Sequence, residues 1–302
     1  MQISLIVGAT NKRLDKSLSA IFNKISRSKI KAAIDAKKVK VNGKVEKPSF
    51  KLDATSLISL ELDLDKGIKL KAQNIPLDII YEDEDIIVVN KPKGMVVHPA
   101  PGHEDNTLVN ALLYHTDKLS DLAGKYRQGI VHRLDKNTSG ILVVAKNNKA
   151  HADLKAQFKN REVEKVYEAL VKGRIEEDKA KIDAPISRAE YNRQKMAVTA
   201  SGKRAITYFD VIKRYTNATY IRIKIVTGRT HQIRVHMHYI GHPVLGDKEY
   251  GGKTKLTKDT EQLLFAKSIA FRHPRTHERV EFSVAAPEDF KKVLAALEKE
   301  NR

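Results

Sequence analysis

The sequence predicts an α+β protein with a small N-terminal domain and linker at residues 1–75 and a larger domain at residues 76–302. Strand and helix patterns alternate irregularly in the larger part, which favours a mixed or antiparallel sheet over a doubly wound parallel one. Two short amphipathic patterns and a hairpin signal precede residue 51, so the N-terminal part is expected to form a separate module. A chain of 302 residues is long enough for two domains and a sizeable core.

The N-terminal domain is predicted to combine an edge strand, two helices and a hairpin. Residues 3–7 are apolar but too few for the core of a signal sequence, so they predict an edge strand. Residues 13–23 place four apolar side chains on one helical stripe, and a second helix follows serines that can cap its free amides. Residues 39–45 alternate around Asn42-Gly43, which is the strongest short-range hairpin signal.

The charge of the chain indicates a polyanionic partner. The formal net charge is +19 and the isoelectric point is about 9.8. Residues 12–51 hold 13 Lys and Arg against 3 Asp and Glu, a net charge of +10. This clustering favours contacts with the phosphates of a nucleic acid over a merely solvated basic face. The candidate residues for these phosphate contacts are Arg27, Lys29, Lys31, Lys37 and Lys44.

The larger domain shows strand and helix patterns of ordinary length. The predicted strands cover residues 86–90, 141–145, 165–171, 205–212, 219–226 and 280–284. The predicted helices cover residues 106–116, 149–159, 230–240 and 288–300. No internal repeat or low-complexity tract is present.

Several classes of chemistry lack their sequence motifs. The chain has no cysteine, which excludes disulfides, a thiolate nucleophile and a cysteine-ligated zinc. It has neither a P-loop nor a G-x-G-x-x-G motif, so nucleotide hydrolysis and dinucleotide chemistry are not expected. The longest apolar runs are too short to span a membrane, and we expect a cytoplasmic protein.

The histidines near residue 236 and Ser139 do not match the sequence pattern of a metal site or of a serine hydrolase. His231, His236, His238 and His242 lie close together, but their spacing does not bring them to one helical face, and no metal site is expected. Ser139 does not lie in a G-x-S-x-G turn, so a hydrolase centred on it lacks its motif.

The most informative stretch is Gly129-Ile-Val-His-Arg-Leu-Asp-Lys-Asn-Thr-Ser-Gly140. It holds polar residues between two apolar segments, residues 130–131 and 141–145, which are predicted to be buried strands. If the chain is extended here, Arg133 and Asp135 point to one face while Leu134 points to the core. Such a pair is either a functional group on a rigid platform or a structural ion pair at a strand end.

The run HRLDKNTSG resembles the signature of the RluA-type pseudouridine synthases. Residues 85–94, 164–171, 183–188 and 227–236, together with the tail from residue 264 to 287, resemble further blocks of that family in the same order. The block at residues 183–188 and the overall arrangement are most similar to the bacterial large-subunit ribosomal RNA enzymes of type D. The resemblance covers nearly the whole chain and implies a pseudouridine synthase catalytic domain.

The resemblance also implies roles for five residues of this domain. Asp135 corresponds to the catalytic aspartate, Arg229 to a cation that pairs with it, and Tyr167 to the active-site tyrosine, which would stack on uracil. Arg133 is expected to touch the RNA, and Ile233 to pack near the uracil. The reaction breaks the N1–C1′ bond of uridine and joins C5 to C1′, so no cofactor is expected. The residues leave open whether Asp135 attacks the sugar or the base, or acts as a base.

The N-terminal domain resembles the αL-type RNA-binding motif, although Lys37 stands where a glycine commonly precedes the hairpin. The expected function is therefore isomerisation of specific uridines, within large-subunit ribosomal RNA or its precursor particle, and no membrane or protein partner is implied. The alternative is a non-catalytic RNA-binding ribosome-assembly factor on the same fold. The joint presence of Asp135, Tyr167 and Arg229 favours the enzyme, because a binding protein needs none of them together.

Overall fold

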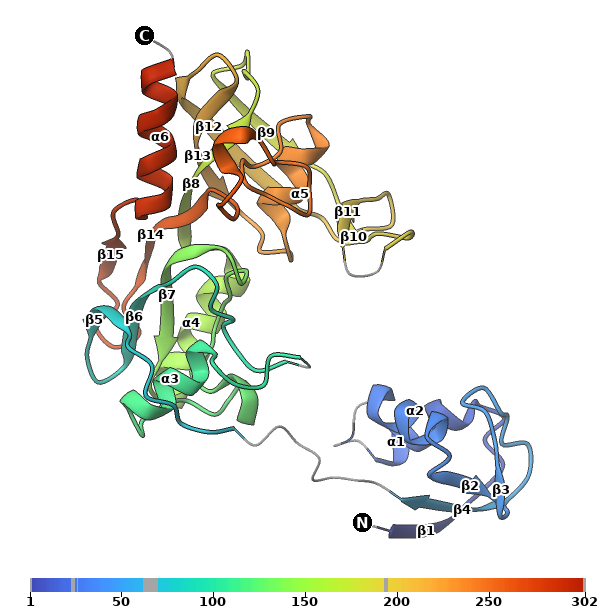
Figure 1. Cartoon of the computed structure of the whole chain (residues 1–302). Coiled ribbons are helices and arrows are strands. Elements are labelled where there is room, and N and C mark those ends of the chain that lie inside the picture. Colours follow the sequence, from blue (N-terminus) through green and yellow to red (C-terminus); the bar gives the residue numbers. More distant parts are fainter. Residues whose placement is uncertain are drawn as a thin grey trace. The chain divides into compact units, whose positions relative to one another are not determined.

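The computed structural model describes residues 2–22, 25, 27–61, 70–100, 102–192 and 195–300. The chain divides into two compact units, residues 1–68 and residues 69–302. Each unit buries its own apolar residues. Figure 1 shows the helices and strands of both units. Residues 71 and 73, which the sequence placed in the linker, bond to the first turn of a helix of the second unit.

The first unit is a four-stranded antiparallel sheet with two helices. Its strands follow the order β1-β4-β2-β3, so β1 lies at an edge, as predicted. The elements are β1 (Gln2–Val7), α1 (Leu14–Ile21), α2 (Arg27–Asp35), β2 (Val39–Val41), β3 (Lys44–Val45) and β4 (Ser56–Glu61).

The local sequence explains these elements. Leu14 and Leu18 of α1 and Ile34 of α2 are buried in one core with the strands, which confirms the stripe of α2 and the first half of that of α1. Ile21 of the predicted α1 stripe is exposed, because the helix ends at this residue. Asn42 and Gly43 both have positive φ angles, 49° and 80°, as a two-residue hairpin turn requires. Lys37 also has a left-handed φ of 60°, the conformation for which a glycine is favoured. The expected serine cap of α2 includes Ser26, which lies outside the described residues.

The second unit is built on a large mixed sheet. Among the described residues it has the order β5-β6-β7-β14-β8-β13-β12-β9, with β15 paired to β14; only β7 and β14 pair in parallel. The strands are β5 (Asp78–Glu82), β6 (Ile86–Lys91), β7 (Ser139–Ala145), β8 (Glu164–Lys172), β9 (Lys179–Asp183), β12 (Ile206–Arg214), β13 (Ala218–Ile225), β14 (Leu264–Arg272) and β15 (Arg279–Ser283). A separate hairpin, β10 (Ile186–Arg188) with β11 (Met196–Val198), projects from this body (Figure 1).

Helices cover both faces of this sheet. Apolar residues of α3 (Leu108–His115) and α5 (Gln232–Tyr239) belong to one core, and those of α4 (Asn148–Asn160) and α6 (Glu288–Glu300) belong to the other. Strands β6 and β7 contribute alternate residues to the two cores, as strands buried on both faces must. Two short 3₁₀ turns, Lys125–Arg127 and Lys255–Thr257, lie in connections. No described helix is both long and apolar enough to cross a membrane.

The predicted α+β class with a mixed sheet is confirmed, as are the six predicted strands and four predicted helices of the second unit, within a few residues. The sequence interpretation missed β5, β9, β10, β11 and β14. It was wrong about residues 130–131. There Ile130 forms only an isolated bridge with Val144, because the chain bends at once away from the sheet.

Gly140 allows β7 and β14 to approach closely, next to the loop that carries Asp135. It has a φ of 110°, and a Cβ at this position would collide with the backbone of Ala266. The two strands pair only at residues 139–140 and 265–266. Only glycine fits both the conformation and the contact.

Candidate active site

The loop before β7 presents Asp135 as the sequence predicted. Arg133 is exposed, Leu134 is buried in the core, and Asp135 lies between these extremes with its side chain 19% exposed. The alternation follows from an extended chain that fixes its middle residue by apolar packing. Leu134 therefore anchors a loop whose two charged neighbours face a shared cavity.

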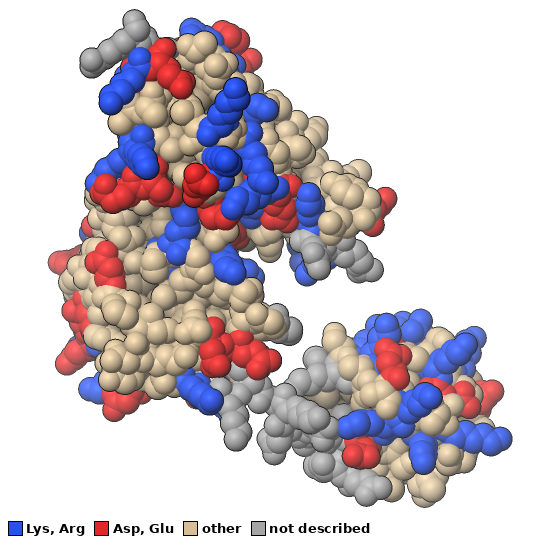
Figure 2. Space-filling view, in the orientation of Figure 1, with Lys and Arg blue, Asp and Glu red and all other residues tan. Residues whose placement is uncertain are grey.

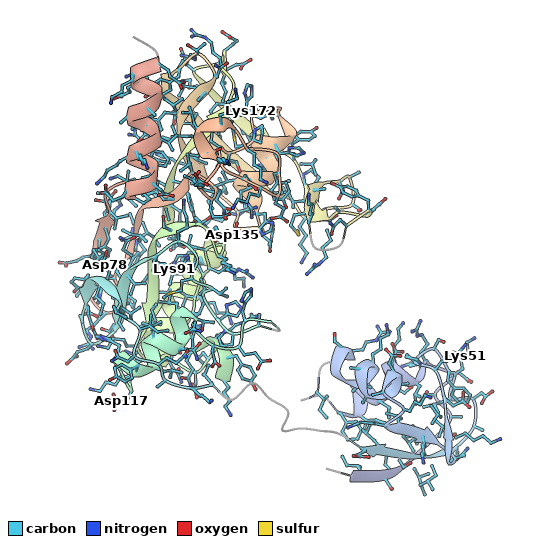
Figure 3. All side chains as sticks on the ribbon, in the orientation of Figure 1. Lys51, Asp78, Lys91, Asp117, Asp135 and Lys172 are labelled. Atoms are coloured by element: carbon cyan, nitrogen blue, oxygen red, sulfur yellow. The ribbon has the colours of Figure 1, made fainter. Side chains whose placement is uncertain are left out.

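A buried lysine at the end of β6, Lys91, bonds to this loop; Figure 3 labels Lys91 and Asp135. The ammonium group of Lys91 donates to the carbonyl oxygens of Pro92 at 2.8 Å, Met95 at 2.8 Å and Lys136 at 3.2 Å. Burial lowers the pKa of Lys91 to about 7, against the opposing effect of Asp135. Three carbonyl acceptors match the three donors of an ammonium group, so Lys91 ties the end of β6 to the residue after Asp135. The sequence interpretation gave Lys91 no role.

His132 fixes the other side of the loop. The backbone N–H of Val143 in β7 donates to Nε2 of His132 at 3.0 Å, so the ring carries its proton on Nδ1 when neutral. The ring stacks on Phe158 with centroids 4.7 Å apart. Burial, together with the charge of Lys165, lowers the pKa of His132 to about 3. The histidine is therefore a neutral structural element beside the loop that carries Asp135.

Arg234 of α5 is the cation that lies beside Asp135. Its Nη1 is 3.6 Å from Oδ2 of Asp135. Its other nitrogens donate to Asp247 at 2.6 and 2.9 Å and to Glu249 at 2.8 Å. Burial disfavours the charged guanidinium, but hydrogen bonds and charge from Asp247 outweigh it and raise the pKa of Arg234. Arg234 is thus a fixed positive charge held by two carboxylates and turned toward a third.

Arg229 does not form the ion pair with Asp135 that the sequence interpretation expected. Its guanidinium is exposed, and Nε donates to the carbonyl oxygen of Arg204 at 3.1 Å. Its backbone N–H donates to Oε1 of Gln232 at 3.0 Å, which orders the turn before α5. Because Arg229 precedes the helix while Arg234 lies within it, only Arg234 enters the buried carboxylate cluster. Both arginines belong to the block at residues 227–236, and their spacing gave no signal to distinguish them.

One cavity of about 430 Å³ is lined by all five candidate residues of this unit. Tyr167 and Ile233 are 6% and 5% exposed and supply apolar surface. Burial and the neighbouring charge of Asp135 raise the pKa of Tyr167, so its phenol stays protonated. Among the described residues that line the cavity, Asp135 is the only carboxylate, whereas six are basic: Arg133, Lys159, Arg161, Lys165, Arg229 and Arg234. The cavity suits an aromatic base attached to an anionic backbone.

The histidines near α5 take structural hydrogen bonds. His236 is buried, with Nδ1 2.9 Å from the Thr207 hydroxyl and Nε2 2.9 Å from the carbonyl oxygen of Ala184. His231 lies 2.9 Å from the Tyr250 hydroxyl. The His236 ring therefore uses both of its nitrogens in hydrogen bonds within the protein, and the His231 ring uses Nδ1.

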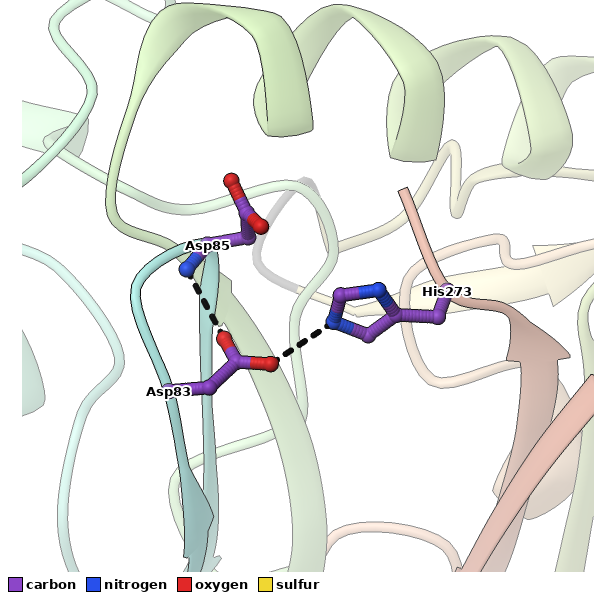
Figure 4. Close-up of side chains that lie close together, drawn as sticks. All are labelled: Asp83, Asp85 and His273. Atoms are coloured by element: carbon purple, nitrogen blue, oxygen red, sulfur yellow. Dashed lines mark hydrogen bonds and ion pairs between the residues drawn. The ribbon is translucent and has the colours of Figure 1, made fainter. Parts of the chain in front are cut away.

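Asp83, Asp85 and His273 are the side chains of types that bind metals which cluster closely in the described part of the chain (Figure 4). The carboxylate of Asp83 accepts from the backbone amides of Asp85 and Ile86 and from Nε2 of His273. Asp85 accepts from Asn147 and Arg275. These groups are already paired within the protein, so the cluster closes the β5–β6 turn and does not present a free set of ligands.

The basic residues of the first unit differ in their surroundings. Lys31, Lys37 and Lys44 are exposed, and Figure 2 shows Lys and Arg side chains over much of the visible face of this unit. Arg27 donates to the buried carboxylate of Asp15 at 2.6 Å, which fixes its guanidinium against α1. The side chain of Lys29 lies outside the described residues.

The fold and this cavity define an RNA-modifying isomerase. Residues 85–239 match the family described as RNA pseudouridylate synthase, and residues 12–58 match the S4 domain, which covers the predicted αL-type motif. The chain belongs to the RNA pseudouridine synthase family.

The sequences of related proteins align with this chain over nearly its full length. The chain is 47% identical to an "Uncharacterized RNA pseudouridine synthase" of Aquifex aeolicus, with 97% of this chain and 96% of the relative covered. It is 42% identical to "Ribosomal large subunit pseudouridine synthase D" of Zymomonas mobilis, with 100% and 98% covered. The solved structure of human RNA Pseudouridylate Synthase Domain Containing 1 has a TM-score of 0.58 and 27% identity, covering 75% of this chain and 96% of that one.

Proposed function

We propose that this enzyme isomerises uridines of large-subunit ribosomal RNA and that Asp135 is its catalytic residue. The observation that carries the proposal is the position of Asp135: among the described residues it is the one carboxylate in a basic, aromatic-lined cavity, and Arg234 lies 3.6 Å from it. The large-subunit substrate is supported by relatives named pseudouridine synthase D, which are 42% and 43% identical over almost the whole chain.

Arg234 places a fixed positive charge beside the carboxylate of Asp135. A guanidinium within a few ångströms stabilises a carboxylate, and Arg234 cannot turn away because Asp247 and Glu249 hold it. An ionised carboxylate at the sugar of the bound nucleotide assists cleavage of the N1–C1′ bond. The uracil then turns, C5 joins C1′, C5 loses its proton and N1 gains one, so the composition of the nucleoside is unchanged.

Tyr167 and Ile233 hold the base during this rotation. Both are almost fully buried at the cavity wall, where a flipped uracil gains stacking and apolar contact. Arg133 is exposed, lines the cavity and is close in sequence to Asp135. We propose that it contacts the RNA at the position from which the uracil has flipped out. Exposed Lys31, Lys37 and Lys44 of the first unit contact phosphates outside the cavity.

Release of tritium from C5-labelled uridine tests the substrate class. Large-subunit RNA, small-subunit RNA and transfer RNA are labelled and offered separately, as naked RNA and, for the ribosomal RNAs, as precursor particles. We expect release from large-subunit RNA. Release from another class alone would contradict the substrate, and no release from any would favour a binding protein on this fold.

A further inference from the structure

Lys165 is a cation inside the catalytic cavity without an anionic partner in the described part of the chain. It lies on β8 two residues before Tyr167, so the two side chains leave the strand on the same side, and both line the cavity. Its ammonium group lies over the ring of Phe158, with Nζ 5.5 Å from the ring centroid. Burial lowers the pKa of Lys165 to about 8.

This position differs from that of the other buried cations in the unit. Arg234 is matched by Asp247, Glu249 and Asp135. Lys91 is matched by three carbonyl oxygens. An ammonium group that is partly removed from water and faces an aromatic ring retains unused donors. The protein therefore carries an electrostatic cost at Lys165 that an anion entering the cavity would relieve.

The surroundings of Lys165 add positive charge. Lys159 and Arg161, at the end of α4, line the same cavity beside Phe158. The cavity therefore holds the Asp135–Arg234 ion pair together with Lys159, Arg161 and Lys165, three cations for which the described residues show no anionic partner.

We propose that Lys165 binds a backbone phosphate of the RNA beside the uridine being isomerised, so that this contact positions the sugar against Asp135. The inference rests on the proposed function. The phosphodiester groups of a nucleotide are bonded to its sugar, so a sugar at Asp135 and a base at Tyr167 bring a phosphate among the cations that line the same cavity. Of these cations, Lys165 is partly buried, lies on the strand that carries Tyr167, and has no anionic partner among the described residues. The ammonium then exchanges water for a charge-assisted bond to a phosphate oxygen.

The test compares Lys165→Met, which removes the charge, with Lys165→Arg, which retains it. Lys172→Met is the matched control, because Lys172 is exposed at the opposite end of the same strand (Figure 3). Binding of a large-subunit RNA fragment is measured against salt in an Asp135→Asn background, and kcat and KM are measured with Asp135 present.

We expect Lys165→Met to weaken binding at low salt by about ten-fold. The slope of log affinity against log salt should fall by about 0.7, the value for one phosphate of a single strand. Lys165→Arg and Lys172→Met should keep the original slope. A neutral methylphosphonate next to the modified uridine should weaken binding by the wild-type chain and add nothing to Lys165→Met.

Two results would overturn the phosphate contact: a slope in Lys165→Met equal to that of Lys172→Met, or full sensitivity of Lys165→Met to the methylphosphonate. In either case Lys165 merely packs on Phe158. The proposed function fails by a different result, which is absence of tritium release by the wild-type enzyme, and the binding measurements do not depend on turnover.

Discussion

The guanidinium of Arg234 lies 3.6 Å from the carboxylate of Asp135 while donating shorter bonds to Asp247, at 2.6 Å, and to Glu249, at 2.8 Å. Arg234 is therefore held primarily by its structural partners and offers its remaining edge to Asp135. This arrangement leaves the Asp135 carboxylate oriented by a nearby charge but not locked in a bidentate pair. A carboxylate that must approach a substrate benefits from that freedom.

Replacing Arg234 should damage both folding and catalysis. Arg234→Met leaves the fully buried Asp247 without its cation, and we expect a loss of about 3–5 kcal/mol in the free energy of unfolding. Arg229→Met removes an exposed guanidinium and should change that free energy by no more than about 0.5 kcal/mol. Urea unfolding of both variants measures the difference. Equal losses would show that Arg229, and not only Arg234, belongs to the buried charge cluster.

The neutral state of His132 predicts a dependence of stability on pH. Its pKa is about 3 in the folded protein against an ordinary value of 6.5, so below pH 6.5 the unfolded chain binds a proton that the folded chain does not. The contribution of His132 to the free energy of unfolding is fully present above pH 6.5. It declines as the pH falls toward 3, by up to about 1.4 kcal/mol per pH unit. His132→Gln, whose amide oxygen can still accept from Val143, should lack this contribution.

Urea unfolding of the wild type and His132→Gln at pH 7.5, 6.5, 5.5 and 5 measures that contribution, because every other titrating group is common to both proteins. The wild type should lose stability relative to the variant between pH 6.5 and 5. A difference in free energy of unfolding between the two proteins that stays constant over this range would mean that folding does not lower the pKa of His132.

Two truncations separate the function of the first unit from the stability of the second. Deletion of residues 1–68 should weaken RNA binding and lower the salt slope by about 2–3, the value for three phosphate contacts by Lys31, Lys37 and Lys44. Deletion of residues 1–75 should in addition lower the melting temperature, because it removes the bonds of Lys71 and Gln73 to Asn106 and Asn110. Equal salt slopes for the full chain and the shorter truncation would contradict the phosphate contacts.

Much of this fold could be predicted because its signals are local. The Asn42-Gly43 turn, the apolar stripes of α1 and α2, and the position of Asp135 after a buried leucine all follow from neighbouring residues. Strand β14 was missed, although its nine residues are mostly buried, because its pairing with β7 and β8 joins segments far apart in sequence.

The candidate site was less predictable for the same reason. Arg234 faces Asp135 only because α5 packs beside a loop 99 residues earlier in the chain, and no spacing rule reports that contact. Lys91 donates to backbone carbonyl groups. Every residue carries such a group, so no residue type in the sequence identifies the partners of Lys91. The sequence therefore indicated five side chains that line one cavity, whereas the partner of Asp135 and the position of Lys91 depend on tertiary packing.

The most direct measurement is release of tritium from C5 of uridine in large-subunit RNA by the wild type, Asp135→Asn and Asp135→Glu, with Asp117→Asn as control. Asp117 is exposed and lies outside the cavity (Figure 3). RNA binding by each protein is measured in parallel. The account predicts release by the wild type and Asp117→Asn and none by Asp135→Asn, with binding retained. Release by Asp135→Asn at the wild-type rate would show that Asp135 is not the catalytic residue.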